Sequence, residues 1–235
     1  MSSLLWSVPL CVVHDHDQRL VLTAAVVCAV GVYASFALAT HAARSTDKAR
    51  RLWGLVSVVA GACTAWATHF IVLLAFKPGM VAAFDPVLTA TSLVFAMIGI
   101  GTGVMLALGT RNKVRRFIAG LIVGLGVVLL HYVGQAAYLV HGTVSWNLWL
   151  VVPSILVSLP ISGLALMAAS QRNRRIRACA APLLLFSIAV LHFCGMAAMT
   201  LHFDPNHILP ADAVSPVAIT PVVAGISLGL SLIHI

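Results

Sequence analysis

The sequence contains no glutamate, so aspartate is its only acidic residue type. Six aspartates stand against 14 lysines and arginines, and charged residues make up only 9% of the 235 residues. Because a soluble globular domain is about a quarter charged, this composition excludes an ordinary soluble fold. The absence of glutamate also excludes glutamate as a general acid, a metal ligand or a proton relay.

Cysteine is scarce and scattered. An odd number of cysteines is spread over different segments, which argues against a disulfide framework: Cys11, Cys28, Cys63, Cys179 and Cys194. Residues 1–19 contain a short apolar run with neither a basic region before it nor a cleavage site after it. We therefore expect this segment to be a short outer N-terminal segment and not a signal peptide.

Apolar residues make up 61% of the chain and gather in long runs. Each run is close to the length that crosses a hydrocarbon core of about 30 Å as a helix. Helices satisfy their own backbone hydrogen bonds in lipid, so the fold predicted is an all-α, polytopic membrane protein with seven transmembrane helices. The predicted spans are 20–40, 52–76, 87–109, 117–140, 148–169, 178–201 and 216–235.

The basic residues mark one face of the predicted membrane domain. All but Arg19 and Lys77 fall in three alternate loops: Arg44, Lys48, Arg50 and Arg51; Arg111, Lys113, Arg115 and Arg116; Arg172, Arg174, Arg175 and Arg177. By the positive-inside rule the N-terminus lies outside and the seventh span ends in the cytoplasm. The net charge of +8 therefore reports topology and not nucleic-acid binding, which needs a basic face on a soluble fold.

One pattern recurs in three of the spans, at residues 66–76, 128–138 and 189–199. Each copy has a histidine followed by an aromatic residue and then by small apolar residues, and the histidines are His69, His131 and His192. Their spacing equals one helical hairpin with its loops, so the chain reads as three tandem helical hairpins plus a seventh helix.

The three histidines lie at one depth. They follow the last basic residue of their loops by 15 to 18 residues, which is about 22 to 27 Å of helix and places them in the outer part of the membrane. If the repeats pack around a pseudo-threefold axis, the three imidazoles converge. For any one of them, a neutral imidazole bonded to a neighbouring carbonyl is the alternative interpretation.

Three convergent imidazoles would make a zinc or copper site with one open position. Met196 shares a helix face with His192, but Leu73 and Gln135 occupy its equivalent positions, so a thioether is available only once. Further candidates to line the site are Tyr132, Gln135, Cys194 and Met199.

These segments, together with residues 34–38 and 120–138, resemble the MHYT domain of bacterial membrane sensors. The resemblance covers nearly the whole chain and implies a sensor domain over 20–235 in the bacterial inner membrane. It implies copper bound by His69, His131, His192 and Met196, with O2, CO, NO or redox state as the signal. It also implies a C-terminal output module for cyclic-di-GMP synthesis or hydrolysis. Because the last span stops at Ile235 with no basic residue after it, we expect the chain to be a fragment that lacks this module.

The motifs depart from the family pattern at its methionines. Thr68, Leu130 and Leu191 replace the methionine before each histidine, and Leu73 and Gln135 replace the later one in two repeats. The loss of sulfur weakens the case for copper more than the case for a metal, so zinc and haem stay open.

Three functions are thus distinguished by the sequence. The first is a non-enzymatic sensor domain in the lipid bilayer that binds a metal and a diatomic gas and signals to a cytoplasmic output. The second is a seven-helix membrane hydrolase with a three-histidine zinc, which the lack of a nearby acid disfavours. The third is transport or haem binding, which lacks proton-relay carboxylates and an evident large pocket.

Overall fold

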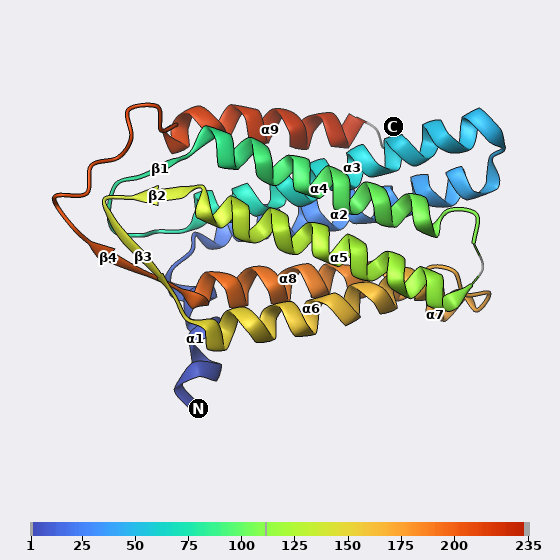
Figure 1. Cartoon of the computed structure of the whole chain (residues 1–235), viewed down its shortest axis with the longest axis horizontal. Coiled ribbons are helices and arrows are strands. Elements are labelled where there is room, and N and C mark those ends of the chain that lie inside the picture. The colour runs from blue at the N-terminus through green and yellow to red at the C-terminus, as the bar shows by residue number, and fades with distance from the viewer. Residues whose placement is uncertain (1, 111, 233–235) are drawn as a thin grey trace.

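The computed structural model describes residues 2–110 and 112–232. Six helical segments are long and apolar enough to cross a membrane, and they lie side by side (Figure 1). They are α2 (Gln18–Arg44), α3 (Asp47–Ala75), α4 (Pro86–Ala107), α5 (Lys113–Ala136), α6 (Leu148–Ala168), and α7 (Arg174–Ala178) with α8 (Ala180–Ala198). The prediction of a multi-pass helical membrane protein is supported.

The seventh predicted span is shorter than the others. Its counterpart α9 (Pro216–Leu232) has 17 residues and packs mainly against α3. The last predicted residues, 233–235, lie outside the described part of the chain. A seventh crossing is therefore not confirmed. The N-terminal segment forms a further helix, α1 (Ser2–His14).

Asparagine and aspartate set where most of these helices begin. Their side-chain oxygens accept hydrogen bonds from backbone N–H groups in the first helical turn, which have no partner inside the helix. The residues that cap helices in this way are Asp17 for α2, Asp85 for α4, Asn112 for α5, Asn147 for α6 and Asn173 for α7.

The fold is helical as predicted, and four short strands lie in the connections between the helices. β1 (Ala82–Phe84) pairs antiparallel with β2 (Tyr138–Val140), and β3 (Gly142–Trp146) pairs antiparallel with β4 (Met199–Phe203). The predictions that helices continue to residues 140 and 201 were wrong. At these points the backbone leaves the helix and satisfies its polar groups by pairing between neighbouring connections.

The strands gather at one end of the helices, which we call the strand end, together with the end of α1 (Figure 1). The opposite end, with α7 and the loops α2–α3 and α4–α5, we call the basic end. It carries the clustered cations predicted for one face: Arg44, Lys48, Arg50, Arg51, Lys113, Arg115, Arg116, Arg172, Arg174, Arg175 and Arg177. Arg111, assigned to the same face, lies outside the described residues.

Consecutive helices pack as hairpins, α2 with α3, α4 with α5 and α6 with α8. The second helix of each hairpin lies toward the centre, and α5 contacts both α3 and α8. Within their most apolar windows, α3 and α5 are 78% and 56% buried, whereas the outer helices α2 and α4 are 28% and 22% buried. The segment with α8 is 39% buried against 33% for α6, so the histidine-bearing helix, which we call the inner helix, is the more buried one in each hairpin.

The α4–α5 contact depends on two glycines. A Cβ atom built on Gly126 would lie 2.8 Å from the Cα of Gly99, so the two backbones touch with no room for a side chain. Small residues that allow such close approach are a common basis of helix packing in membranes.

We therefore expect Gly126→Leu to force α4 and α5 apart and to destabilise the protein by about 1–3 kcal/mol. The measurement is the thermal unfolding midpoint in detergent. Gly225→Leu is the control, since nothing lies within 4 Å of a Cβ at that position on α9. Equal midpoints for the two variants would contradict the packing described.

Candidate metal centre

His69 on α3, His131 on α5 and His192 on α8 come together in the centre of the inner helices. Their side chains are buried, with 4%, 2% and 7% of their surfaces exposed. The Nδ1 atom of His69 lies 3.3 Å from Nδ1 of His192 and 3.2 Å from Nδ1 of His131. All three ligand atoms lie within 4.8 Å of one another. The predicted convergence of the three repeats is therefore present.

Two glycines make room for the imidazoles. Gly134 and Gly195 each follow a motif histidine by three residues, so each lies one helical turn beyond it. A Cβ atom on Gly134 would collide with the imidazole of His69, and one on Gly195 would collide with the imidazole of His131. Each of these two rings thus packs against the backbone of another inner helix. The sequence analysis missed this role, although the shared spacing from histidine to glycine was visible.

The first repeat departs from this arrangement, because Val72 stands where the other two have glycine. A cavity of about 270 Å³ opens beside the histidines, and Val72, His69, His131 and His192 all belong to its wall. The rest of its wall is almost entirely apolar and comes from α2, α3, α5 and α8. One side of the histidine cluster therefore borders an apolar cavity that is large enough for a small ligand.

The donor set fits a metal ion bound through Nδ1. Nitrogens that each lie about 2.05 Å from one ion at tetrahedral angles are about 3.3 Å apart, which matches the two separations measured here. Among the described residues the three Nε2 atoms have no hydrogen-bond partner. A neutral imidazole with its proton on Nε2 keeps the Nδ1 lone pair free for a metal. No aspartate or cysteine in the described part of the chain joins the cluster.

Met196, the fourth predicted ligand, is fully buried beside the cluster. Its sulfur accepts a hydrogen bond of 3.2 Å from Nε2 of Gln135. The same Gln135 nitrogen lies 3.2 Å from the carbonyl oxygen of Gly195. Gln135 therefore links α5 to α8 next to the histidines and holds the thioether.

The remaining predicted residues lie around the cluster without joining it. The hydroxyl of Tyr132 bonds to Ser154 on α6 at 2.7 Å, although its ring touches that of His131. Cys194 is half-buried, and Met199 begins β4. Of these three residues, Tyr132 links α5 to α6.

A fourth histidine closes the strand end of the site. His16 is 2% exposed, and its Nδ1 lies 2.9 Å from the carbonyl oxygen of Cys11. Its ring packs against Phe76 and Phe193, and burial lowers the pKa of its imidazole. The sequence analysis placed His16 in the outer N-terminal segment, and nothing in the pattern indicated that its side chain is buried. Backbone bonds from Asp17 to Ala75 and from Lys77 to Asp15 hold this segment in place.

Sequence comparison identifies two of the repeats. The model of the MHYT family, described as a bacterial signalling protein N-terminal repeat, matches residues 63–120 and 124–182. These matches contain His69 and His131, whereas His192 lies beyond them. The third copy of the motif is identified by its own residues and by the position of His192 in the histidine cluster. No solved structure matches the chain significantly.

Curated relatives are signalling proteins. The chain is 32% identical over 218 residues to an uncharacterized signaling protein of Caulobacter vibrioides, covering 92% of this chain and 27% of the relative. It is 31% identical to the cyclic di-GMP phosphodiesterase NbdA of Pseudomonas aeruginosa, covering 64% of this chain and 20% of the relative. It is 29% identical to the bifunctional diguanylate cyclase/cyclic di-GMP phosphodiesterase MucR of that organism, covering 79% and 28%. The chain thus spans about a quarter of the length of these relatives.

The contact between His131 and Gly195 can be tested by a double-mutant cycle. Gly195→Ala places a methyl group in the imidazole, so we expect it to destabilise the protein by about 1–3 kcal/mol. In a His131→Ala background the destabilisation caused by the same change should be smaller by at least about 1 kcal/mol, because the methyl group no longer meets an imidazole. Unfolding of the metal-free protein in detergent measures both. Gly225→Ala combined with His131→Ala is the control for additivity, and an additive Gly195 cycle would contradict the contact.

Proposed function

Because the chain belongs to the MHYT family of bacterial signalling proteins, we propose that it is the membrane-embedded sensory input of such a protein. The observation that carries this proposal is the buried cluster of three imidazoles beside an apolar cavity. Ionisable side chains inside a membrane domain are costly and generally functional. Three imidazoles at one point, with no carboxylate among the described residues of the cluster, favour a bound cation.

His69, His131 and His192 would hold the metal through Nδ1. Met196 follows His192 by four residues on the same helix face and would be the fourth ligand. Copper is proposed because a thioether is present beside imidazoles, with zinc and haem as the alternatives. When bound, such an ion would supply an open coordination position for O2, CO or NO, or a change of redox state. The protein's part is to orient the three nitrogens, exclude water and offer the ligand an apolar approach.

The proposed output lies outside this chain. Two relatives are named for cyclic-di-GMP turnover, and this chain covers about a quarter of their length, so we propose that it is non-enzymatic and controls a linked cyclic-di-GMP domain. α9 packs against α3, which carries His69, and leads to the end of the chain. A ligand shifts such a connection only if it binds one arrangement of the helices more tightly than another.

A zinc hydrolase is the second candidate, favoured by nitrogen separations that suit zinc. Such a site needs an acid or base next to the metal-bound water. No carboxylate belongs to the cluster in the described part of the chain, so we rank this function lower. Hydrolysis of lipid amides or esters by the purified protein would reverse the ranking.

We expect purified wild-type protein to carry about one metal ion per chain and His69/His131/His192→Ala to carry none, because three nitrogens supply most of the binding energy. Elemental analysis after purification without an affinity tag that binds metal measures this. His41/His141/His207→Ala is the matched control, as it removes three histidines outside the cluster. The same metal content in all three proteins would rule out a shared site.

The proposed orientation places the basic end in the cytoplasm of a bacterium, at its inner membrane. Cys179 at that end is exposed, whereas the other described cysteines are buried or half-buried. A membrane-impermeant maleimide should therefore label the protein in inverted vesicles and not in intact cells.

Cys179→Ser should abolish this labelling. In the same background, Asn206→Cys on the exposed loop after β4 should restore it from the outside of intact cells. Labelling of Cys179 in intact cells would show the opposite orientation.

A further inference from the structure

A second cavity lies between the inner and outer helices in the half of the molecule nearer the basic end. Its volume is about 170 Å³, and all six membrane-length helical segments contribute to its wall. An engineered protein cavity of about 150 Å³ with an apolar lining stays dry and binds benzene. The space here is therefore of the size that holds part of an apolar ligand.

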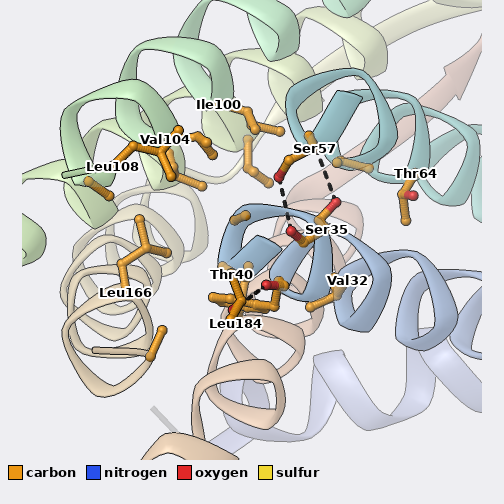
Figure 2. A pocket seen from close by; sticks show the side chains of 18 of the residues that line it. Val32, Ser35, Thr40, Ser57, Thr64, Ile100, Val104, Leu108, Leu166 and Leu184 are labelled. Carbon is orange, nitrogen blue, oxygen red and sulfur yellow. Dashed lines mark hydrogen bonds between the residues drawn. The ribbon is translucent and has the colours of Figure 1, made fainter. Parts of the chain in front are cut away.

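The wall presents few polar groups to a ligand, although it includes hydroxyls. The hydroxyls of Ser35 and Ser57 each donate to the carbonyl oxygen of the other residue, at 3.3 and 2.9 Å (Figure 2). Thr40 and Thr64 donate to carbonyl oxygens of their own helices. Figure 2 also shows Ile100 and Val104 of α4, and Leu108 directly after it, facing Leu166 and Leu184 across the space. With the hydroxyl protons engaged, the wall favours an apolar chain.

One cation stands at the edge of this cavity. Arg116 lines it near the start of α5 and is half-buried. Its Nε donates to the carbonyl oxygen of Thr110 at 2.8 Å, and within the described ranges it has no acidic partner. The two terminal nitrogens of the guanidinium are left to bind an anion. Arginine is well suited to this because its fork matches carboxylate and phosphate geometry.

The length of the space matches one half of a bilayer. From Arg116 to Val127, where the lining ends on α5, the helix rises about 16 Å. Half of a hydrocarbon core of about 30 Å is about 15 Å, which is the depth reached by one acyl chain. The head group of such a chain would lie level with Arg116 at the basic end.

We propose that this cavity binds one acyl chain of an anionic amphiphile, with its carboxylate or phosphate head group held by Arg116. The chain lies among the six helices, and its tip reaches the part of the wall formed by Cys28, Ala65, Val127 and Ile188. These four residues also line the cavity beside the histidines. The occupant thus borders the histidine site without touching its nitrogens. Free fatty acids and anionic phospholipids share this chemistry.

The test uses oleic acid with a photoreactive diazirine at the end of its chain, added to the full chain in a neutral detergent. Labelled residues are mapped by mass spectrometry. We expect labels on cavity residues such as Cys28 and Ile188, and about tenfold less labelling by oleyl alcohol with the same diazirine, because it lacks the charge. Labels confined to lipid-facing positions, or equal labelling by acid and alcohol, would overturn the proposal.

Two pairs of variants make the test specific. Val104→Phe fills the cavity and should lower labelling about tenfold, whereas Val94→Phe, on the same helix but 53% exposed, should leave it unchanged. Arg116→Gln should remove the preference for the acid, whereas Arg115→Gln, an exposed neighbour with the same change in charge, should keep it. Wild-type labelling in both Val104→Phe and Arg116→Gln would overturn the proposal.

A phosphatidylglycerol with the same photoreactive chain identifies the source. Cavity labelling by this lipid supports a membrane phospholipid as the occupant, and labelling only by oleic acid supports a free fatty acid. Labelling of the cavity by neither probe would overturn the proposal. None of these readouts depends on a metal, so they stand apart from the proposed sensor function.

Discussion

The packing of an imidazole against the backbone of a neighbouring helix is the contact on which the centre of this molecule depends. His69 lies against Gly134 and His131 against Gly195, so α3, α5 and α8 approach one another at the level of the histidines. Without those glycines the rings would have to leave the centre. The same contacts aim the Nδ1 atoms inward and the Nε2 atoms toward backbone. The geometry of the candidate site and the arrangement of the inner helices therefore have a common cause.

Because hydrocarbon offers no hydrogen-bond partners, most other polar side chains in the helices bond to backbone groups nearby in the sequence. Hydroxyl groups inside the helices mostly donate to carbonyl oxygens, and polar side chains at the helix starts accept backbone N–H groups. An unsatisfied polar group is expensive in hydrocarbon. The histidine cluster stands out against this background, since it concentrates nitrogen atoms whose hydrogen bonding the protein alone does not complete.

Much of this arrangement was predictable from the sequence. Apolar runs predicted six of the helices, the basic loops predicted which helix ends lie together, and the repeat of His69, His131 and His192 predicted the cluster. These are periodic signals that survive without knowledge of tertiary contacts. The strands were missed because β2 and β4 are apolar and directly follow helices, so the pattern does not show where the helix ends. The burial of His16 was missed because it depends on Phe76 and Phe193, which are far away in the sequence.

The two small sheets tie three connections together at one end only. β1 belongs to the α3–α4 connection, β2 and β3 to the α5–α6 connection, and β4 to the connection that follows α8. Every inner helix is therefore fastened at the strand end, close to its histidine. At the basic end the hairpins are joined within themselves by short loops, and a cavity separates the helices there. In the described part of the chain, strand pairing thus joins the connections of all three inner helices near their histidines, whereas no strand joins one hairpin to another at the basic end.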